Sequence, residues 1–143
     1  MDAVAERAYQ KLEANLEELT KIYRQLLDAV RKEKEILVRA DREALEESNL
    51  LKEELLYKLR AQDSLRSRYA MDLATIVGAD IENPRLLELA QKLAGTPAAD
   101  RLRTQHAALD NIKEALSGKK TYESKGKYKQ GPQVSGNFVS KEA

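Results

Sequence analysis

Apolar residues in the first third of the chain recur at alternating steps of four and three, the spacing typical of a coiled coil. This first stripe consists of Leu12, Leu16, Leu19, Tyr23, Leu26 and Val30. A second stripe with the same spacing consists of Leu55, Leu59, Gln62, Arg66, Tyr69, Leu73 and Ile76. Residues 2–77 contain neither Gly nor Pro, so the two stripes predict long helices rather than several short ones.

The two stripes differ in phase, which indicates a turn between them. Beyond Leu37, a strict continuation of the first stripe falls on Ala40, Ala44, Glu47, Leu51, Glu54, Lys58 and Ala61, a series with one large apolar residue, whereas the second stripe follows a different phase. Asp41 is a suitable N-cap, and Glu43 would then stand favourably in the first helical turn. We therefore expect helices at about residues 2–39 and 42–77 that pair as an antiparallel hairpin. A single continuous helix with a phase shift also fits the pattern.

Gly and Pro residues divide the next forty positions into shorter elements. Gly favours the position just after a helix, and Asn-Pro or Thr-Pro suits an N-cap followed by the first helical residue. The signals are Gly78, Asn83-Pro84, Gly95, Thr96-Pro97 and Gly118. They predict a short helix at 84–94 and a third helix at 97–116. The apolar stripe of this third helix is Leu102, Gln105 or His106, Leu109, Ile112 and Leu116.

Residues 118–143 differ in composition from the helical part. Gly, Ser, Lys and Gln dominate and apolar residues are sparse, so this tail cannot bury enough surface to offset the entropy of ordering. From Ser117 onward there are six lysines and two glutamates, a net charge of +4 in a chain whose total is +1. We expect an all-α fold: a helical coiled-coil domain at 1–117, in which the short and third helices pack against the hairpin, and a disordered basic tail at 118–143.

Residues that could carry catalysis or bind a metal are scarce. The chain has no Cys, which excludes disulfides and thiolate metal sites. His106 is its single His, which leaves little scope for His-based metal sites or triads. His106 lies on a helical stripe and is interpreted as an edge-of-core residue. Adjacent glutamates such as Glu46-Glu47 and Glu53-Glu54 are typical of a solvated helix face. We predict no enzyme activity, no metal site and no cofactor.

The start of the chain and its apolar runs bear on location. No apolar run approaches the roughly 18 to 20 residues of a membrane span. The first residues are acidic and lack the basic start and apolar centre of a signal peptide. We expect a cytoplasmic protein with no stable membrane insertion.

Three roles are open for the tail. Its lysines and tyrosines could contact RNA or an anionic membrane, although Glu123 interrupts the basic run. It could also remain solvated with no partner. A protein-docking role is favoured over both, because Tyr122 and Tyr128 are spaced aromatic anchors that suit a segment folding against a partner protein.

Four stretches of the chain resemble the FlgN-type flagellar export chaperones. They are residues 19–28 with 33–37, residues 45–59, the helical region 86–116, and the segment 121–127. The last is the most discriminating, because it follows three helical segments and places Tyr122 four residues before Gly126 in a polar extension.

The resemblance implies a chaperone for the hook–filament junction proteins of the flagellum. Such chaperones hold the C-terminal helices of these substrates, prevent premature assembly and deliver them to the type III export gate. The resemblance places binding on the C-terminal helix and tail, which here means Leu102, Leu109, Ile112, Leu116, Tyr122 and Tyr128. Leu109→Asp is then expected to abolish capture and leave the N-terminal hairpin folded.

The alternative function is a structural coiled-coil scaffold or adaptor protein. A long uniform dimer needs a seam that stays apolar, and Glu33, Gln62 and Arg66 interrupt both stripes. We therefore expect a monomer or a weak homo-oligomer that binds proteins and not nucleic acid.

Overall fold

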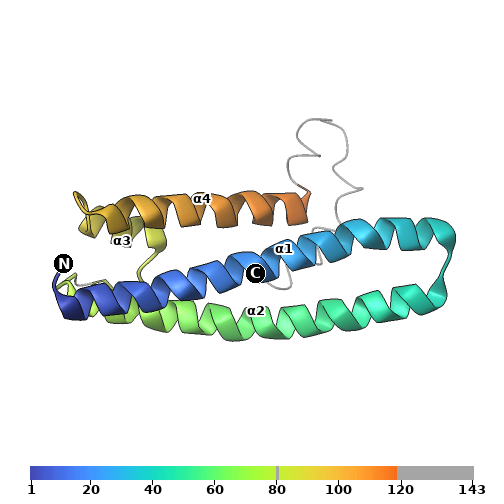
Figure 1. Ribbon diagram of the computed structural model, residues 1–143, viewed down its shortest axis with the longest axis horizontal. Helices are drawn as coiled ribbons and strands as arrows, with labels where there is room; N and C mark the ends of the chain where they lie inside the picture. Colours follow the sequence, from blue (N-terminus) through green and yellow to red (C-terminus); the bar gives the residue numbers. More distant parts are fainter. Residues whose placement is uncertain (80, 119–143) are drawn as a thin grey trace.

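The computed structural model describes residues 1–79 and 81–118, which form four α-helices (Figure 1). Their bounds are α1 Ala3–Arg39, α2 Arg42–Ile76, α3 Leu86–Lys92 and α4 Pro97–Ser117. α1 and α2 form a long antiparallel hairpin, α4 lies along α1, and short α3 packs on α4. The predicted all-α hairpin with a short helix and a third long helix is confirmed. The predicted tail beyond residue 118 lies outside the described residues.

Polar caps and left-handed residues end most helices where the sequence predicts. The Asp2 and Asp41 carboxylates accept hydrogen bonds from the backbone N–H groups of Ala5 and Ala44, at 2.8 and 3.1 Å. Thr96 is the N-cap of α4 and Pro97 its first residue. Gly78 after α2 and Gly118 after α4 have φ of 76° and 72°, which Gly adopts without steric cost.

The predicted start of the short helix at Asn83-Pro84 is wrong. The N-cap is Arg85, whose backbone N–H donates to Glu88 Oε1 at 3.2 Å. Asn83 has a φ of 52°, in the left-handed region that Asn tolerates in turns. An N-cap needs extended backbone, so Asn83 shapes the connection to α3 instead of starting it.

α1 is the central helix of the core. Its buried side chains pack against α2 on one side and α4 on the other. The largest fully buried side chains are Tyr9, Leu12, Leu16, Leu19, Ile22, Leu26, Leu73, Leu89 and Leu102. Six of these nine belong to α1, so α1 joins the hairpin and α4 into one core.

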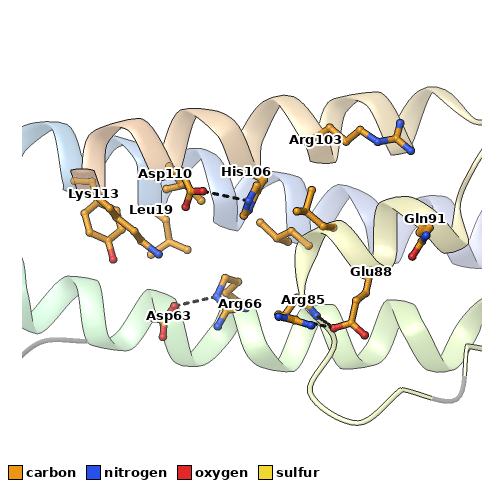
Figure 2. Close-up of a pocket in the computed structure, with 14 residues that line it drawn as sticks. Leu19, Asp63, Arg66, Arg85, Glu88, Gln91, Arg103, His106, Asp110 and Lys113 are labelled. Carbon is orange, nitrogen blue, oxygen red and sulfur yellow. Dashed lines mark hydrogen bonds and ion pairs between the residues drawn. The ribbon is translucent and has the colours of Figure 1, made fainter. Parts of the chain in front are cut away.

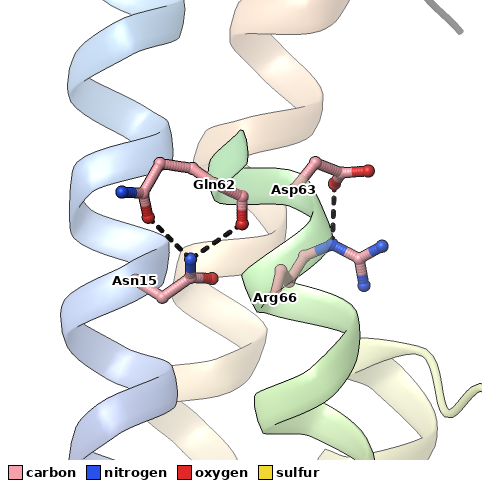
Figure 3. Close-up of polar contacts among 4 residues, drawn as sticks. All are labelled: Asn15, Gln62, Asp63 and Arg66. Atoms are coloured by element: carbon pink, nitrogen blue, oxygen red, sulfur yellow. Dashed lines mark hydrogen bonds and ion pairs between the residues drawn. The ribbon is translucent and has the colours of Figure 1, made fainter. Parts of the chain in front are cut away.

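Two polar positions of the second stripe lie at different places around α2. Gln62 faces α1, where it accepts a hydrogen bond from Asn15 (Figure 3). Arg66 stays on α2 and pairs with Asp63, with 2.9 Å between Nε and Oδ1. Gln62 therefore takes part in a polar contact with α1, whereas Arg66 lies at the edge of the core.

α4 runs parallel to α1 and is shorter. Arg101 approaches Glu13 at 3.8 Å, and further along the Lys113 ammonium lies 5.5 Å from the centre of the Tyr23 ring. The same offset brings Ser117, the end of α4, beside residues 27–29 of α1. The hairpin continues beyond this point to its turn at residues 40–41 (Figure 1).

Candidate protein-binding site

A groove of about 780 Å³ lies between α2 and α4. α1 forms its floor and α3 its end wall (Figure 2). The lining residues come from all four helices: Leu19, Tyr23, Asp63, Arg66, Arg85, Leu86, Leu87, Glu88, Gln91, Arg103, His106, Leu109, Asp110 and Lys113. The volume lies in the range of protein ligand sites, about 300 to 1,000 Å³.

The base of the groove is apolar. Leu19 of α1 and Leu109 of α4 are buried at its floor, with 2% and 5% of their surface exposed. Leu87 of α3 is half exposed at the end wall. A leucine that is half exposed beside buried leucines can lose further apolar surface to a ligand, which is the usual basis of helix-in-groove binding.

The rim of the groove is polar and carries charged side chains, and the contacts among them form within single helices or between a helix and its own cap. On α2, Arg66 pairs with Asp63; on α3, Arg85 pairs with Glu88 at 3.0 Å. On α4, His106 Nε2 lies 3.3 Å from Asp110 Oδ2, at the edge of the core as predicted for this histidine. Since none of these pairs joins α2 to α4, they leave the mouth of the groove open (Figure 2).

Two contacts between α1 and α4 hold the groove's α4 wall in place. The Lys113 ammonium over the half-buried Tyr23 ring is a cation–π contact. Burial, followed by the charge of Asp63, raises the pKa of Tyr23 above its ordinary value.

At the other end of α4, Tyr9 and Arg101 meet at Glu13. The Tyr9 hydroxyl donates to Glu13 Oε2 at 2.9 Å, on the carboxylate that Arg101 also approaches. Burial and this hydrogen bond raise the pKa of Tyr9 to about 12. Both tyrosines are therefore neutral at physiological pH, which suits the buried Tyr9 ring and the half-buried Tyr23 ring.

The predicted helical binding residues share one face of α4, and that face packs inside the protein. The exposed fractions of Leu102, Leu109, Ile112 and Leu116 are 1%, 5%, 9% and 8%. Of these four, Leu109 also lines the groove. Leu109→Asp would therefore disturb the packing of α4 as well as the groove. Tyr122 and Tyr128 lie outside the described residues.

Sequence reasoning missed the groove itself. Its walls are separated by some forty residues of sequence, and their approach depends on α4 packing parallel to α1. One signal pointed toward it: the polar residue Arg66 interrupts the apolar stripe of α2 and lies on the rim. Leu87 lies on a short helix whose other leucines are buried in the core, and the sequence pattern does not distinguish it from them.

Residues 1–79 and 81–118 hold no candidate for two other kinds of site, a metal site and a membrane span. In that part of the chain, no group of three or more His, Cys, Asp or Glu side chains is arranged to hold a metal ion. None of its helices combines the length and apolar character that crossing a membrane requires.

The model of the family described as FlgN protein matches residues 1–120. Neither the curated proteins nor the solved structures gave a match to the chain. The family match covers most of the 143 residues, including every helix described above.

Proposed function

The chain belongs to the FlgN family of flagellar export chaperones, and we propose that it binds the C-terminal helices of hook–filament junction proteins in the groove between α2 and α4. FlgN is a family of chaperones and not of enzymes, in keeping with the scarcity of catalytic residues in the sequence. The observation that carries this proposal is the open groove along α1.

The groove suits an amphipathic helix. α1, α2 and α4 supply three neighbouring helices around an apolar strip, so a fourth helix laid in the groove completes a bundle-like arrangement. Its apolar face would cover Leu19, Leu87 and Leu109. Its polar flanks would meet the charged rim, where both signs of charge are present.

The residues predicted from the resemblance take different roles in this proposal. Leu109 contacts the substrate helix directly at the floor of the groove. Leu102, Ile112 and Leu116 position α4 against α1, since all three are buried there. Tyr122 and Tyr128 follow α4 in the chain and are proposed as further aromatic anchors for the substrate.

Masking an assembly helix requires reversible binding. The polymerising helices of a filament subunit are amphipathic and would associate prematurely in the cytoplasm. A groove that buries their apolar face prevents this without ATP, and it must release them at the export gate. Dissociation constants between micromolar and nanomolar, roughly −8 to −12 kcal/mol, meet both needs.

Two substitutions to Asp, one at the groove and one outside it, test the proposed binding site. Leu87→Asp places a charge at the groove wall, where the side chain is 50% exposed, so folding is retained. Val38→Asp makes a comparable change at the hairpin turn, where the side chain is 87% exposed and outside the groove. The probe is a fluorescent peptide of the C-terminal segment of a hook–filament junction protein, followed by anisotropy.

The two variants should differ clearly. We expect Leu87→Asp to weaken binding by about tenfold or more, since a buried unpaired carboxylate costs over 1.4 kcal/mol. Val38→Asp should bind like the unmodified chain. Equal affinities for all three proteins would place the substrate elsewhere on the molecule.

The alternative of a structural coiled-coil scaffold has less support. The apolar stripe of α1 is already covered within the chain by α2 and α4, so little of it remains for a second copy. Light scattering at several concentrations separates the two functions: the chaperone proposal expects a monomer or a weak homo-oligomer, whereas a scaffold requires a stable assembly.

A further inference from the structure

The outer side of the first half of α2 combines acidic and large apolar residues. Residues 43, 47, 50, 54 and 57 recur at steps of four and three and therefore share one side of the helix. This acidic face, with its flanking residues, consists of Glu43, Glu46, Glu47, Leu50, Glu53, Glu54 and Tyr57. All seven side chains are exposed, with Leu50 at 66% and Tyr57 at 71%.

Nothing basic balances this face within residues 43–57. The one lysine in that stretch, Lys52, is on the opposite side of α2, where it pairs with Glu33 of α1 and has only 14% of its side chain exposed. Among the five glutamates, Glu54 pairs with Lys58 at 3.3 Å. The surface therefore presents five carboxylates around two exposed apolar side chains.

The described helices leave this part of the hairpin uncovered. α4 ends beside residues 27–29 of α1, and its last residues point toward the hairpin turn (Figure 1). After the end of α4 at Ser117, the chain continues for 26 residues. An extended segment gains about 3.3 Å per residue, so ten residues span roughly 33 Å, while residues 43–57 of α2 cover about 21 Å.

The segment that follows α4 complements the acidic face in both charge and apolar content. Residues 119–129 contain five lysines and one glutamate, a net charge of +4, together with Tyr122 and Tyr128. Residues 43–57 of α2 have a net charge of −4. The groove between α2 and α4 is a poorer match, because its lining holds four Arg or Lys side chains against three carboxylates.

We propose that residues 119–129 dock on the acidic face of α2 in the same chain. Lysines then lie among the glutamates, and the two tyrosines cover Leu50 and Tyr57. This docking rests on the acidic face and not on the groove, and it holds Tyr122 and Tyr128 away from the substrate for which they are proposed as anchors. It withholds the basic segment from other partners until a competing surface binds it more tightly, and salt weakens it because the charges are exposed.

A spin label on the segment tests the proposal in the full chain. The chain has no Cys, so Ser124→Cys provides a single labelling position that leaves both tyrosines in place. Broadening of backbone amide signals then reports which residues the label approaches. We expect broadening at residues 46–57 at low salt, and a decrease of about threefold or more at 1 M salt, where the Debye length is near 3 Å.

Matched charge reversals distinguish docking on the acidic face from a general electrostatic attraction between the basic segment and the rest of the chain. Glu46→Lys with Glu53→Lys reverses two exposed charges of the acidic face, and Glu17→Lys with Asp72→Lys makes the same change in charge at exposed positions elsewhere. Far-UV circular dichroism checks that both variants keep their helices. The first variant should lose most of the broadening and the second should retain it.

Three results would overturn the proposal. One is the absence of selective broadening on α2 at low salt. Another is equal loss in both charge-reversal variants. The third is full broadening in a mixture of labelled chain and isotope-enriched unlabelled chain, since the segment would then bind a second copy.

Discussion

Asn15 of α1 donates two hydrogen bonds from Nδ2 to Gln62 of α2, one to its backbone carbonyl oxygen at 2.9 Å and one to Oε1 at 2.8 Å (Figure 3). Asn15 is 4% exposed, and its Oδ1 has no hydrogen-bond partner among the described residues. A buried amide within an apolar seam favours one register, because any shift leaves its polar atoms unpaired.

A single and a double substitution at this pair should affect the free energy of unfolding differently. Asn15→Ala removes both hydrogen bonds and leaves a small cavity, which lowers the free energy of unfolding by about 1 to 3 kcal/mol. The double variant Asn15→Leu with Gln62→Leu removes both polar groups and should equal or exceed the unmodified chain in stability. Urea unfolding measures both. A double variant as unstable as Asn15→Ala would show that the amide pair itself stabilises the hairpin.

Two leucines of α1 should differ strongly in their contribution to stability. Leu16 is fully buried, whereas Leu37, near the hairpin turn, is 57% exposed. Leu16→Ala is expected to lower the free energy of unfolding by about 2 to 5 kcal/mol. Leu37→Ala should change it by less than about 0.5 kcal/mol. Similar losses in thermal or urea unfolding would mean that the hairpin end is covered in solution.

Ala40, between α1 and α2, is a left-handed residue with φ of 55° and ψ of 39°. This conformation costs an L-residue about 1 to 2 kcal/mol and glycine almost nothing, although glycine loses about 0.5 to 1 kcal/mol in chain entropy. Ala40→Gly should therefore raise the free energy of unfolding by up to about 1 kcal/mol. The control Ala44→Gly, inside α2, should lower it by about 1 kcal/mol. A loss in both variants would argue against the left-handed turn.

The pKa of Tyr9 predicts a loss of stability at alkaline pH. The ordinary value is 10.0 and the folded value is about 12, so folding favours the protonated phenol. Its contribution is complete below pH 10 and is lost as the pH rises through 12, with a size of about 3 kcal/mol at most. Tyr9→Phe lacks this part of the decline. Urea unfolding of both proteins across this range measures it, and parallel curves would contradict the assignment.

The buried sides and the ends of the two hairpin helices could be predicted from the sequence, which left open whether a turn separates them. The alternating steps of four and three around Leu16 and Leu59 predict which sides of α1 and α2 are buried, and Asp41 and Gly78 predict where helices begin and end. These are local properties of propensity and periodicity. The predicted helix start at Asn83 was wrong because Asn favours both N-caps and left-handed turns, and the choice between them depends on how α3 packs.

The candidate site was less accessible to sequence reasoning. The stripe containing Leu102 and Leu109 predicts a side of α4 that packs against another element, but an apolar stripe does not specify whether that element is a partner or another helix of the chain. The structure shows α1 in that position. The groove depends on the parallel packing of α4 and on the position of Leu87, both of which arise from contacts between residues distant in sequence.

Titration calorimetry of the full chain against the C-terminal segment of a hook–filament junction protein is the most direct test of the central claim. The account predicts micromolar or tighter binding with a clearly negative change in heat capacity, because apolar surface is buried in the groove. A version ending at Leu116 would retain part of this affinity, and the difference would measure the contribution of the residues after α4. No detectable heat at several temperatures with either version would contradict the chaperone function and favour the structural coiled-coil alternative.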